Sequence, residues 1–192
     1  MKKGKIIFLN GVSSAGKTTL AQALQKIADE PYYYISQDTF CDMWSGKHWE
    51  QDPEKMFNHT MSLMYKTIKM FSDSGNNVVV DHVLLNNDRL KSLNKEGTLQ
   101  DCVETLYGYP VLFVHVICPL EELRRREKER GDRDIGNAES QLDYIDPQDT
   151  YDITVDTYES DIDKCAGHML RLFDEHREMK AFEILKNTFN LL

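Results

Sequence analysis

The segment Gly11–Thr18, near the N-terminus, constrains the fold of this 192-residue chain more than any other. It reads Gly-Val-Ser-Ser-Ala-Gly-Lys-Thr and matches the phosphate-loop (Walker A) pattern G-x-x-x-x-G-K-[ST]. The apolar run Lys5–Leu9 precedes it, and Lys17–Ala28 follows with apolar residues at helical spacing. The order strand, glycine loop, helix is therefore predicted, and such a loop binds phosphates through its backbone N–H groups.

The same loop predicts the ligand and its contacts. Lys17 would reach the terminal phosphates, and the hydroxyl of Thr18 would bind Mg²⁺. A glycine turn that merely links a strand to a helix is the alternative, but it explains neither Lys17 nor Thr18. We therefore expect Mg-ATP as the cofactor, contacted by Gly11, Val12, Ser13, Ser14, Ala15, Gly16, Lys17, Thr18 and Thr19.

Further short apolar runs indicate the rest of the fold, at Tyr32–Ile35, Val78–Val80, Val111–Ile117 and Ile153–Val155. Continuous apolar runs separated by helices are typical of buried parallel strands. The prediction is a three-layer α/β fold with a parallel sheet of about five strands. We expect one closing helix over Ser160–Lys186. Because no repeat or linker interrupts the chain, a single domain over residues 1–192 is predicted.

Composition argues against several classes of partner. The formal net charge is −9, whereas nucleic-acid binding needs Lys and Arg in clustered excess. The four cysteines lie far apart without a C-x-x-C pair, so neither zinc nor a disulfide framework is indicated. The apolar run Ile6–Leu9 is too short for a signal peptide or a membrane span. We expect a cytoplasmic protein with a small-molecule partner, and its oligomeric state stays open.

Two carboxylates follow predicted strands and would meet the phosphate loop at the carboxyl edge of the sheet. Asp81 is predicted to hold Mg²⁺ together with Thr18, although it could instead cap the next helix. Asp38 is expected to orient and deprotonate an attacking hydroxyl as the general base. The alternatives are that Asp81 is the base, or that Asp38 only caps a helix over Thr39–Trp44.

Arginines gather in a charged segment after the fourth predicted strand. Leu120–Arg130 predicts a helix that is broken by Gly131. A mobile lid over about residues 124–141 would neutralise charge on the transferring phosphoryl group and expel water. The candidates for this role are Arg126, Arg130 and Arg133. The alternative is a solvated helix with ion pairs between Glu121 and Arg125 and between Glu122 and Arg126.

Several segments occur in an order that matches a known family: Leu9-Asn10-Gly11 through Lys17, Asp38, Asp81, Arg130-Gly131-Asp132-Arg133, Gln141, Tyr151-Asp152 and Val155-Asp156-Thr157. They resemble chloramphenicol phosphotransferase and its relatives over most of the chain. The resemblance implies an ATP-dependent O-phosphotransferase with an adenylate-kinase-like P-loop kinase core. It also implies that Asp38 is the general base, Lys17 the γ-phosphate ligand, and Arg133, with Arg126 or Arg130, a lid contact.

The acceptor is less constrained, because the resemblance weakens through Lys47–Ser74 and Asn86–Tyr109. His82 and Asp146 also depart from the antibiotic kinase's pattern. No arginine precedes Arg89, which counts against phosphorylated or carboxylated acceptors. Lysines that could still bind an anion are Lys47, Lys55 and Lys66. An apolar set that suits a neutral acceptor, or that simply forms helix core, comprises Phe40, Met43, Trp44, Trp49, Met56, Phe57, Met61, Met64 and Tyr65.

Three functions are therefore compatible with the sequence. We expect transfer of the γ-phosphoryl of Mg-ATP to a hydroxyl of a small neutral molecule, and a chloramphenicol-like compound is one candidate acceptor. A kinase of a sugar nucleotide or another metabolite is the second hypothesis. A nucleotide-dependent switch or binding protein, which phosphorylates no acceptor, is the third.

Overall fold

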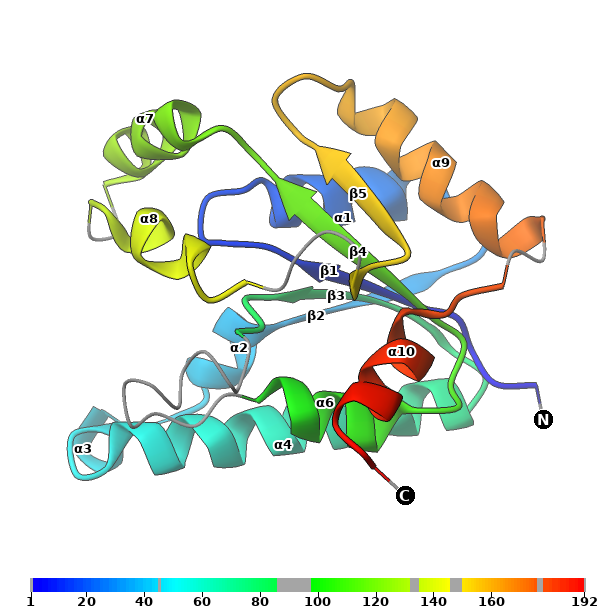
Figure 1. Ribbon diagram of the computed structural model, residues 1–192, viewed down its shortest axis with the longest axis horizontal. Helices are drawn as coiled ribbons and strands as arrows, with labels where there is room; N and C mark the ends of the chain where they lie inside the picture. The colour runs from blue at the N-terminus through cyan, green and yellow to red at the C-terminus, as the bar shows by residue number, and fades with distance from the viewer. Residues whose placement is uncertain are drawn as a thin grey trace.

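A single parallel sheet organises the chain (Figure 1). The computed structural model describes residues 2–44, 46–85, 98–131, 135–145, 150–175 and 178–191. The strands lie in the order β2-β3-β1-β4-β5, and every neighbouring pair is parallel. They are β1 (Ile6–Asn10), β2 (Tyr32–Ser36), β3 (Asn77–His82), β4 (Val111–Ile117) and β5 (Ile153–Asp156). The predicted α/β class with a five-stranded parallel sheet is confirmed.

Burial on both faces explains why the central strands β1, β3 and β4 are continuous apolar runs. All residues of β1 are buried, and the strand lies between β3 and β4. Leu9 on β1 is in register with Asp81 on β3, and Ser36 on β2 is in register with the same Asp81. The carboxyl ends of β1, β2 and β3 therefore meet at one edge of the sheet, which brings the loop after β1 beside Asp81.

Helices cover both faces of the sheet (Figure 1). One face carries a packed pair, α1 (Lys17–Ile27) and α9 (Ile162–Asp174). The other face carries α4 (Pro53–Asp73), α6 (Leu99–Leu106) and α10 (Ala181–Thr188). The other described helices stand toward the carboxyl edge: α2 (Gln37–Cys41), α3 (Gly46–Trp49), α7 (Leu120–Arg130) and α8 (Asn137–Leu142). In the described part of the chain, no helix combines the length and the apolar character that a membrane crossing requires.

The C-terminal region departs from the prediction of one closing helix over Ser160–Lys186. The chain forms two helices there, because α9 ends at Asp174 and α10 begins at Ala181. Asp152 explains the second start, since its carboxylate accepts hydrogen bonds from the backbone N–H groups of Lys180 (2.8 Å) and Ala181 (3.0 Å). This contact spans a long stretch of sequence, and local spacing could not reveal it.

Most of the apolar set expected around the acceptor belongs to the core instead. The fully buried members are Met61, Met64 and Tyr65 on α4. Phe40 and Phe57 are partly buried and pack against the same core, whereas Met43 is 68% exposed. The side chain of Trp49 lies outside the described residues. The core interpretation of these residues therefore fits most of the set.

His82, at the end of β3, is a buried polar residue in this core, stacked between the rings of Phe8 and Tyr65. Its Nε2 lies 2.8 Å from the Tyr65 hydroxyl, which donates its own hydrogen to Thr98 Oγ1 at 2.8 Å. The Tyr65 oxygen must therefore accept from Nε2–H, which defines a neutral imidazole tautomer. Burial, aided by the charge of Lys17, lowers the pKa of His82 to about 3.

Folding stability should consequently fall as the pH drops below about 6.5, the pKa of histidine in an unfolded chain. Below that pH His82 in the unfolded chain binds a proton, whereas His82 in the folded protein binds one only near its lowered pKa of about 3. This difference should remove about 2 kcal/mol of stability between about pH 7.5 and pH 5. Urea unfolding of the wild type and of His82→Gln, whose amide still donates to Tyr65, measures the effect. Equal losses in the two proteins would contradict the assignment.

Candidate active site

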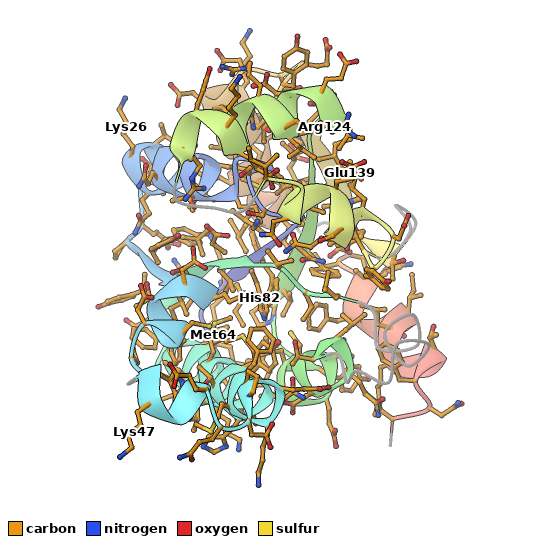
Figure 2. The ribbon with its side chains drawn as sticks, turned by 90° about the vertical axis from the view of Figure 1, so that its left-hand side faces the viewer. Lys26, Lys47, Met64, His82, Arg124 and Glu139 are labelled. Atoms are coloured by element: carbon orange, nitrogen blue, oxygen red, sulfur yellow. The ribbon has the colours of Figure 1, made fainter. Side chains whose placement is uncertain are left out.

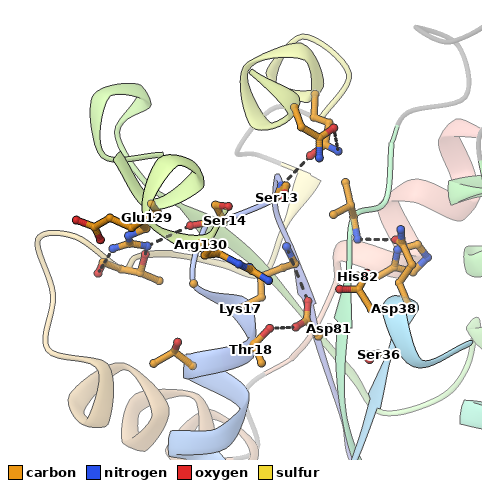
Figure 3. Close-up of a pocket in the computed structure, with 18 of the residues that line it drawn as sticks. Ser13, Ser14, Lys17, Thr18, Ser36, Asp38, Asp81, His82, Glu129 and Arg130 are labelled. Atoms are coloured by element: carbon orange, nitrogen blue, oxygen red, sulfur yellow. Dashed lines mark hydrogen bonds and ion pairs between the residues drawn. The ribbon is translucent and has the colours of Figure 1, made fainter. Parts of the chain in front are cut away.

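One cleft at the carboxyl edge of the sheet collects most of the predicted site residues (Figure 3). Its volume is about 520 Å³. The walls come from the loop after β1, the starts of α1 and α2, the end of β3, and the helices α7 and α8. Predicted residues that line it are Ser13, Ser14, Gly16, Lys17, Thr18, Thr19, Asp38, Asp81, Arg126 and Arg130. Three other predicted contacts, Gly11, Val12 and Ala15, are buried parts of the loop that do not line the cleft.

The loop between β1 and α1 depends on its two glycines. Gly16 has a φ of 93°, and Ser14 also adopts a left-handed conformation with a φ of 61°. A Cβ atom on Gly11 would lie 2.3 Å from the carbonyl oxygen of Val116, so β4 approaches too closely for any side chain there. The glycines of the motif therefore fold the backbone into a tight turn that opens toward the cleft.

Two serine hydroxyls in this turn are buried without a hydrogen-bond partner. They are Ser13 Oγ and Ser14 Oγ, although buried polar groups are normally hydrogen-bonded. Both residues line the cleft. Phosphate oxygens accept hydrogen bonds from hydroxyl and backbone N–H donors alike. The donor set of the loop therefore fits a bound phosphate chain.

Lys17 lies at the start of α1 with only 6% of its surface exposed. Its ammonium donates hydrogen bonds to the carbonyl oxygens of Gly11 (3.0 Å) and Val12 (2.9 Å) and lies 3.8 Å from Asp81 Oδ1. The positive charge thus sits beside the first residues of the loop, within the cleft.

Thr18, Asp81 and Tyr34 form the second polar group of the cleft. Thr18 Oγ1 donates to Asp81 Oδ2 at 2.6 Å, and the Tyr34 hydroxyl donates to the same oxygen at 3.0 Å. Burial and the charge of Asp81 raise the pKa of Tyr34 to about 12, so the phenol stays protonated. A hydroxyl and a carboxylate in contact are the oxygen ligands that Mg²⁺ takes in P-loop enzymes. Tyr34 was not predicted, because it reads as an ordinary strand residue.

Asp38 lies in the first turn of α2, on the opposite side of the cleft from the phosphate loop (Figure 3). The helix begins at Gln37, and its N-cap is Ser36, whose hydroxyl accepts from the Thr39 N–H at 3.1 Å. The alternative in which Asp38 caps a helix over Thr39–Trp44 is therefore wrong. Ser36 provides the cap, and Asp38 lines the cleft.

Two of the three arginines that were predicted to contact the nucleotide, Arg126 and Arg130, lie on α7 and line the cleft. Arg126 braces the phosphate loop, since its guanidinium donates to the Ser14 carbonyl (3.3 Å) and to Thr157 Oγ1 (3.1 Å). Thr157 Oγ1 in turn donates to the Ala15 carbonyl at 2.6 Å. Arg130 also lines the cleft, whereas Arg133 lies outside the described residues.

The predicted ion pairs on α7 are partly right. Glu122 pairs with Arg126 at 2.8 Å, as expected, but Arg125 pairs with Glu122 and Glu129 rather than with Glu121. Hydrogen bonds from Arg125 and Arg126 lower the pKa of Glu122 to about 2. The pairs with Arg125 are exposed to solvent, as a solvated helix face would be.

Two residues that attach α8 to the site were given no role by sequence reasoning. Glu127 is buried, and its carboxylate accepts from the backbone N–H groups of Gly136 (2.9 Å) and Ala138 (2.7 Å) at the start of α8. Gln141 Oε1 accepts from the Ser13 N–H at 2.7 Å. A glutamate in a charged helix gives no local sign that it caps another helix. Gln141 was noted only as part of the family resemblance, without a role.

Comparison with known proteins places the chain among phosphotransferases. Residues 4–174 match the family described as chloramphenicol phosphotransferase-like protein. Two Mycobacterium tuberculosis proteins, each named "Putative O-phosphotransferase", are 29% identical over 213 residues, covering 98% of this chain and 91% of theirs.

Solved structures share the fold at low sequence identity. The APS kinase CysC of Mycobacterium tuberculosis, in complex with AMPPNP and APS, superimposes with a TM-score of 0.66 at 17% identity, covering 91% of this chain and 99% of its own. Shikimate kinase from Acinetobacter baumannii, in complex with shikimate, gives 0.65 at 17% identity over 92% and 96%. The tunicamycin resistance protein of Deinococcus radiodurans gives 0.61 at 16% identity over 89% and 96%. Together with the family match, the fold identifies the chain as a phosphotransferase of the chloramphenicol phosphotransferase-like family of P-loop kinases.

Proposed function

We propose that the protein transfers the γ-phosphoryl group of Mg-ATP to a hydroxyl group of a small neutral molecule. The observation that carries the proposal is the arrangement of one cleft, in which Lys17 and the Thr18–Asp81 pair face Asp38 across the gap. Phosphoryl transfer to an alcohol needs a cation and a loop that bind the phosphates, a pair of metal ligands, and a carboxylate beside the acceptor hydroxyl. The names of the two similar Mycobacterium tuberculosis proteins support phosphoryl transfer, and the AMPPNP bound to the structurally similar APS kinase supports ATP as the donor.

Each residue has a distinct part in this reaction. The N–H groups and hydroxyls of Ser13 and Ser14 would hold phosphate oxygens, and the unpaired hydroxyls support this role. Lys17 would neutralise charge on the transferring group. Asp38 would orient the acceptor hydroxyl and take its proton as the oxygen attacks phosphorus. Arg126 and Arg130, which line the same cleft, would stabilise the transition-state charge from α7.

Magnesium supplies charge neutralisation between the β- and γ-phosphates when it is bound. Thr18 and Asp81 would hold it, because their oxygens lie in contact and the cleft opens beside them. Tyr34 would keep Asp81 in place through its hydrogen bond. Asp81 is thereby occupied by the metal site, which favours Asp38 over Asp81 as the base.

The lining residues favour a neutral acceptor. On the acceptor side, the described part of the cleft is formed by Ser36, Gln37, Asp38, Asp81, His82 and Val83. Among the residues that the structure describes, this side contributes no lysine or arginine, and His82 stays neutral because of its pKa of about 3. A phosphorylated or carboxylated acceptor would bring negative charge toward the carboxylates of Asp38 and Asp81. The exposed Lys47, Lys55 and Lys66 are not among the lining residues.

A panel of acceptors tests the substrate class. Purified protein with Mg-ATP would be incubated with neutral alcohols, aromatic and aliphatic, and in parallel with nucleoside monophosphates, sugar nucleotides and sugar acids. ADP release and a phosphoryl mass increment on the acceptor are measured together. We expect turnover with neutral alcohols and little with the anionic compounds. Turnover confined to anionic acceptors, or nucleotide binding without any phosphorylated acceptor, would overturn the proposal.

A further inference from the structure

The contact between α8 and the phosphate loop uses the backbone N–H of Ser13, a donor that a bound phosphate would need. Gln141 Oε1 lies 2.7 Å from the backbone nitrogen of Ser13, so a glutamine oxygen takes the N–H that the loop turns toward the cleft. Gln141 belongs to α8 and lines the same cleft as the phosphate loop. A phosphate oxygen and Gln141 Oε1 cannot both accept from this single N–H in a linear geometry.

The position of Ser13 in the loop indicates which phosphate is concerned. The Lys17 ammonium bonds to the carbonyl oxygens of Gly11 and Val12, immediately before Ser13. In a phosphate loop this lysine reaches the β- and γ-phosphates. Ser13 therefore lies on the terminal-phosphate side of the loop, and the residues nearer the helix start, Gly16 and Thr18, lie on the inner side.

Three contacts join α7 and α8. Gln141 therefore cannot move away from the phosphate loop with α8 unless α7 moves as well. The buried Glu127 carboxylate accepts from Gly136 N–H and Ala138 N–H at the start of α8. Arg124 forms a bidentate ion pair with Glu139 (Figure 2). A group that interacts with Gln141 therefore acts on the whole α7–α8 unit, which also carries Arg126 and Arg130.

We propose that Gln141 is a terminal-phosphate contact that couples nucleotide occupancy to the position of α7 and α8. Without nucleotide, its amide oxygen holds the Ser13 N–H. With a triphosphate, a γ-phosphoryl oxygen takes that N–H, and the amide turns so that Nε2 donates to the same phosphoryl group. An amide suits this exchange because it offers an acceptor and a donor on one planar group. The inference rests on the proposed function, since it requires ATP in the cleft.

The hydrogen bond made by the amide nitrogen of Gln141 supports the exchange. Nε2 lies 3.3 Å from Asn137 Oδ1, on the same helix, which is a long hydrogen bond that costs little to break. A γ-phosphoryl oxygen carries charge, and hydrogen bonds to charged acceptors are stronger than those between neutral groups. The donor end therefore gains a better partner when the triphosphate is present.

Gln141→Glu tests the inference with little change of shape. A glutamate keeps an oxygen for the Ser13 N–H, but it loses the donor and sets a negative charge against the γ-phosphate. Calorimetry with Mg-ATP and with Mg-ADP should show ATP affinity reduced about tenfold or more and ADP affinity changed by less than about threefold. The turnover number with a competent acceptor should fall with ATP affinity.

Ser140→Glu is the matched control. It adds the same charge one residue away, on an exposed position of α8 that does not line the cleft, and it should leave ATP affinity unchanged. Gln141→Ala, which removes donor and acceptor together, should weaken ATP more than ADP as well. Thermal unfolding of each variant verifies that it is folded.

The outcomes separate this inference from the proposed function. Equal loss of ATP and ADP affinity in both Gln141 variants would show a purely structural role and overturn the inference, as would unchanged ATP affinity and turnover. Wild-type protein that binds neither nucleotide would defeat the proposed function itself. Selective loss of ATP, with the Ser140→Glu control unaffected, is the result that we expect.

Discussion

Asp38→Asn should lower the turnover number for acceptor phosphorylation by roughly 10²- to 10⁴-fold, the usual contribution of a positioned general base. Asparagine keeps the shape and the cleft position of the side chain but cannot take a proton from the attacking hydroxyl. ATP affinity should stay within about twofold, because the phosphate loop lies across the cleft from α2. Initial rates at saturating ATP and acceptor, with calorimetry for ATP, measure both quantities.

Asp42→Asn provides the comparison for this experiment. Asp42 is the exposed C-cap residue of the same helix and does not line the cleft, so its loss of charge should leave turnover unchanged. Normal turnover in Asp38→Asn would remove Asp38 as the base. Asp81→Asn would then be the variant to examine, because Asp81 is the other carboxylate of the cleft.

Lys17→Met should reduce the turnover number about 10²- to 10³-fold, the range seen when one preorganised electrostatic contact to a transition state is removed. Methionine matches the aliphatic part of lysine and fills the same buried space without the charge. The loss should be larger in turnover than in ATP affinity, because charge develops on the transferring group only as the reaction proceeds. Steady-state kinetics at several ATP concentrations separate the two effects.

Lys26→Met, at the exposed end of the same helix, is the control for this variant (Figure 2). Its charge lies outside the cleft, so activity should be retained. Because Lys17 also bonds to Gly11 and Val12, unfolding curves of Lys17→Met must accompany the kinetics. A folded Lys17→Met protein with wild-type turnover would contradict the role assigned to Lys17.

The parts of the fold that could be predicted are those encoded locally. The central strands β1, β3 and β4 are continuous apolar runs that are largely buried, and all five strands were found with only small shifts at their ends. The contact between Thr18 and Asp81 was also predictable, because parallel strands bring their carboxyl ends to one edge. The start of α7 at Leu120 and its end at Arg130 followed from the charged helical run and Gly131.

The parts that could not be predicted depend on contacts between residues distant in sequence. Asp152 splits the expected closing helix by capping α10, and Glu127 caps α8 from the middle of a charged helix. Ser36, rather than Asp38, caps α2, and both residue types are good caps, so local preference could not separate them. Gln141 reaches Ser13 across the cleft, a contact that requires the placed helices.

Titration of magnesium and ATP into the folded, purified protein tests the central claim most directly. The phosphate loop with its unpaired serine hydroxyls, Lys17 and the Thr18–Asp81 pair predicts saturable binding heat with one ATP per chain. The heat should be largely lost when magnesium is replaced by a chelator, because Thr18 and Asp81 would hold the metal that neutralises the triphosphate charge. A folded protein that gives no binding heat with Mg-ATP would contradict the account.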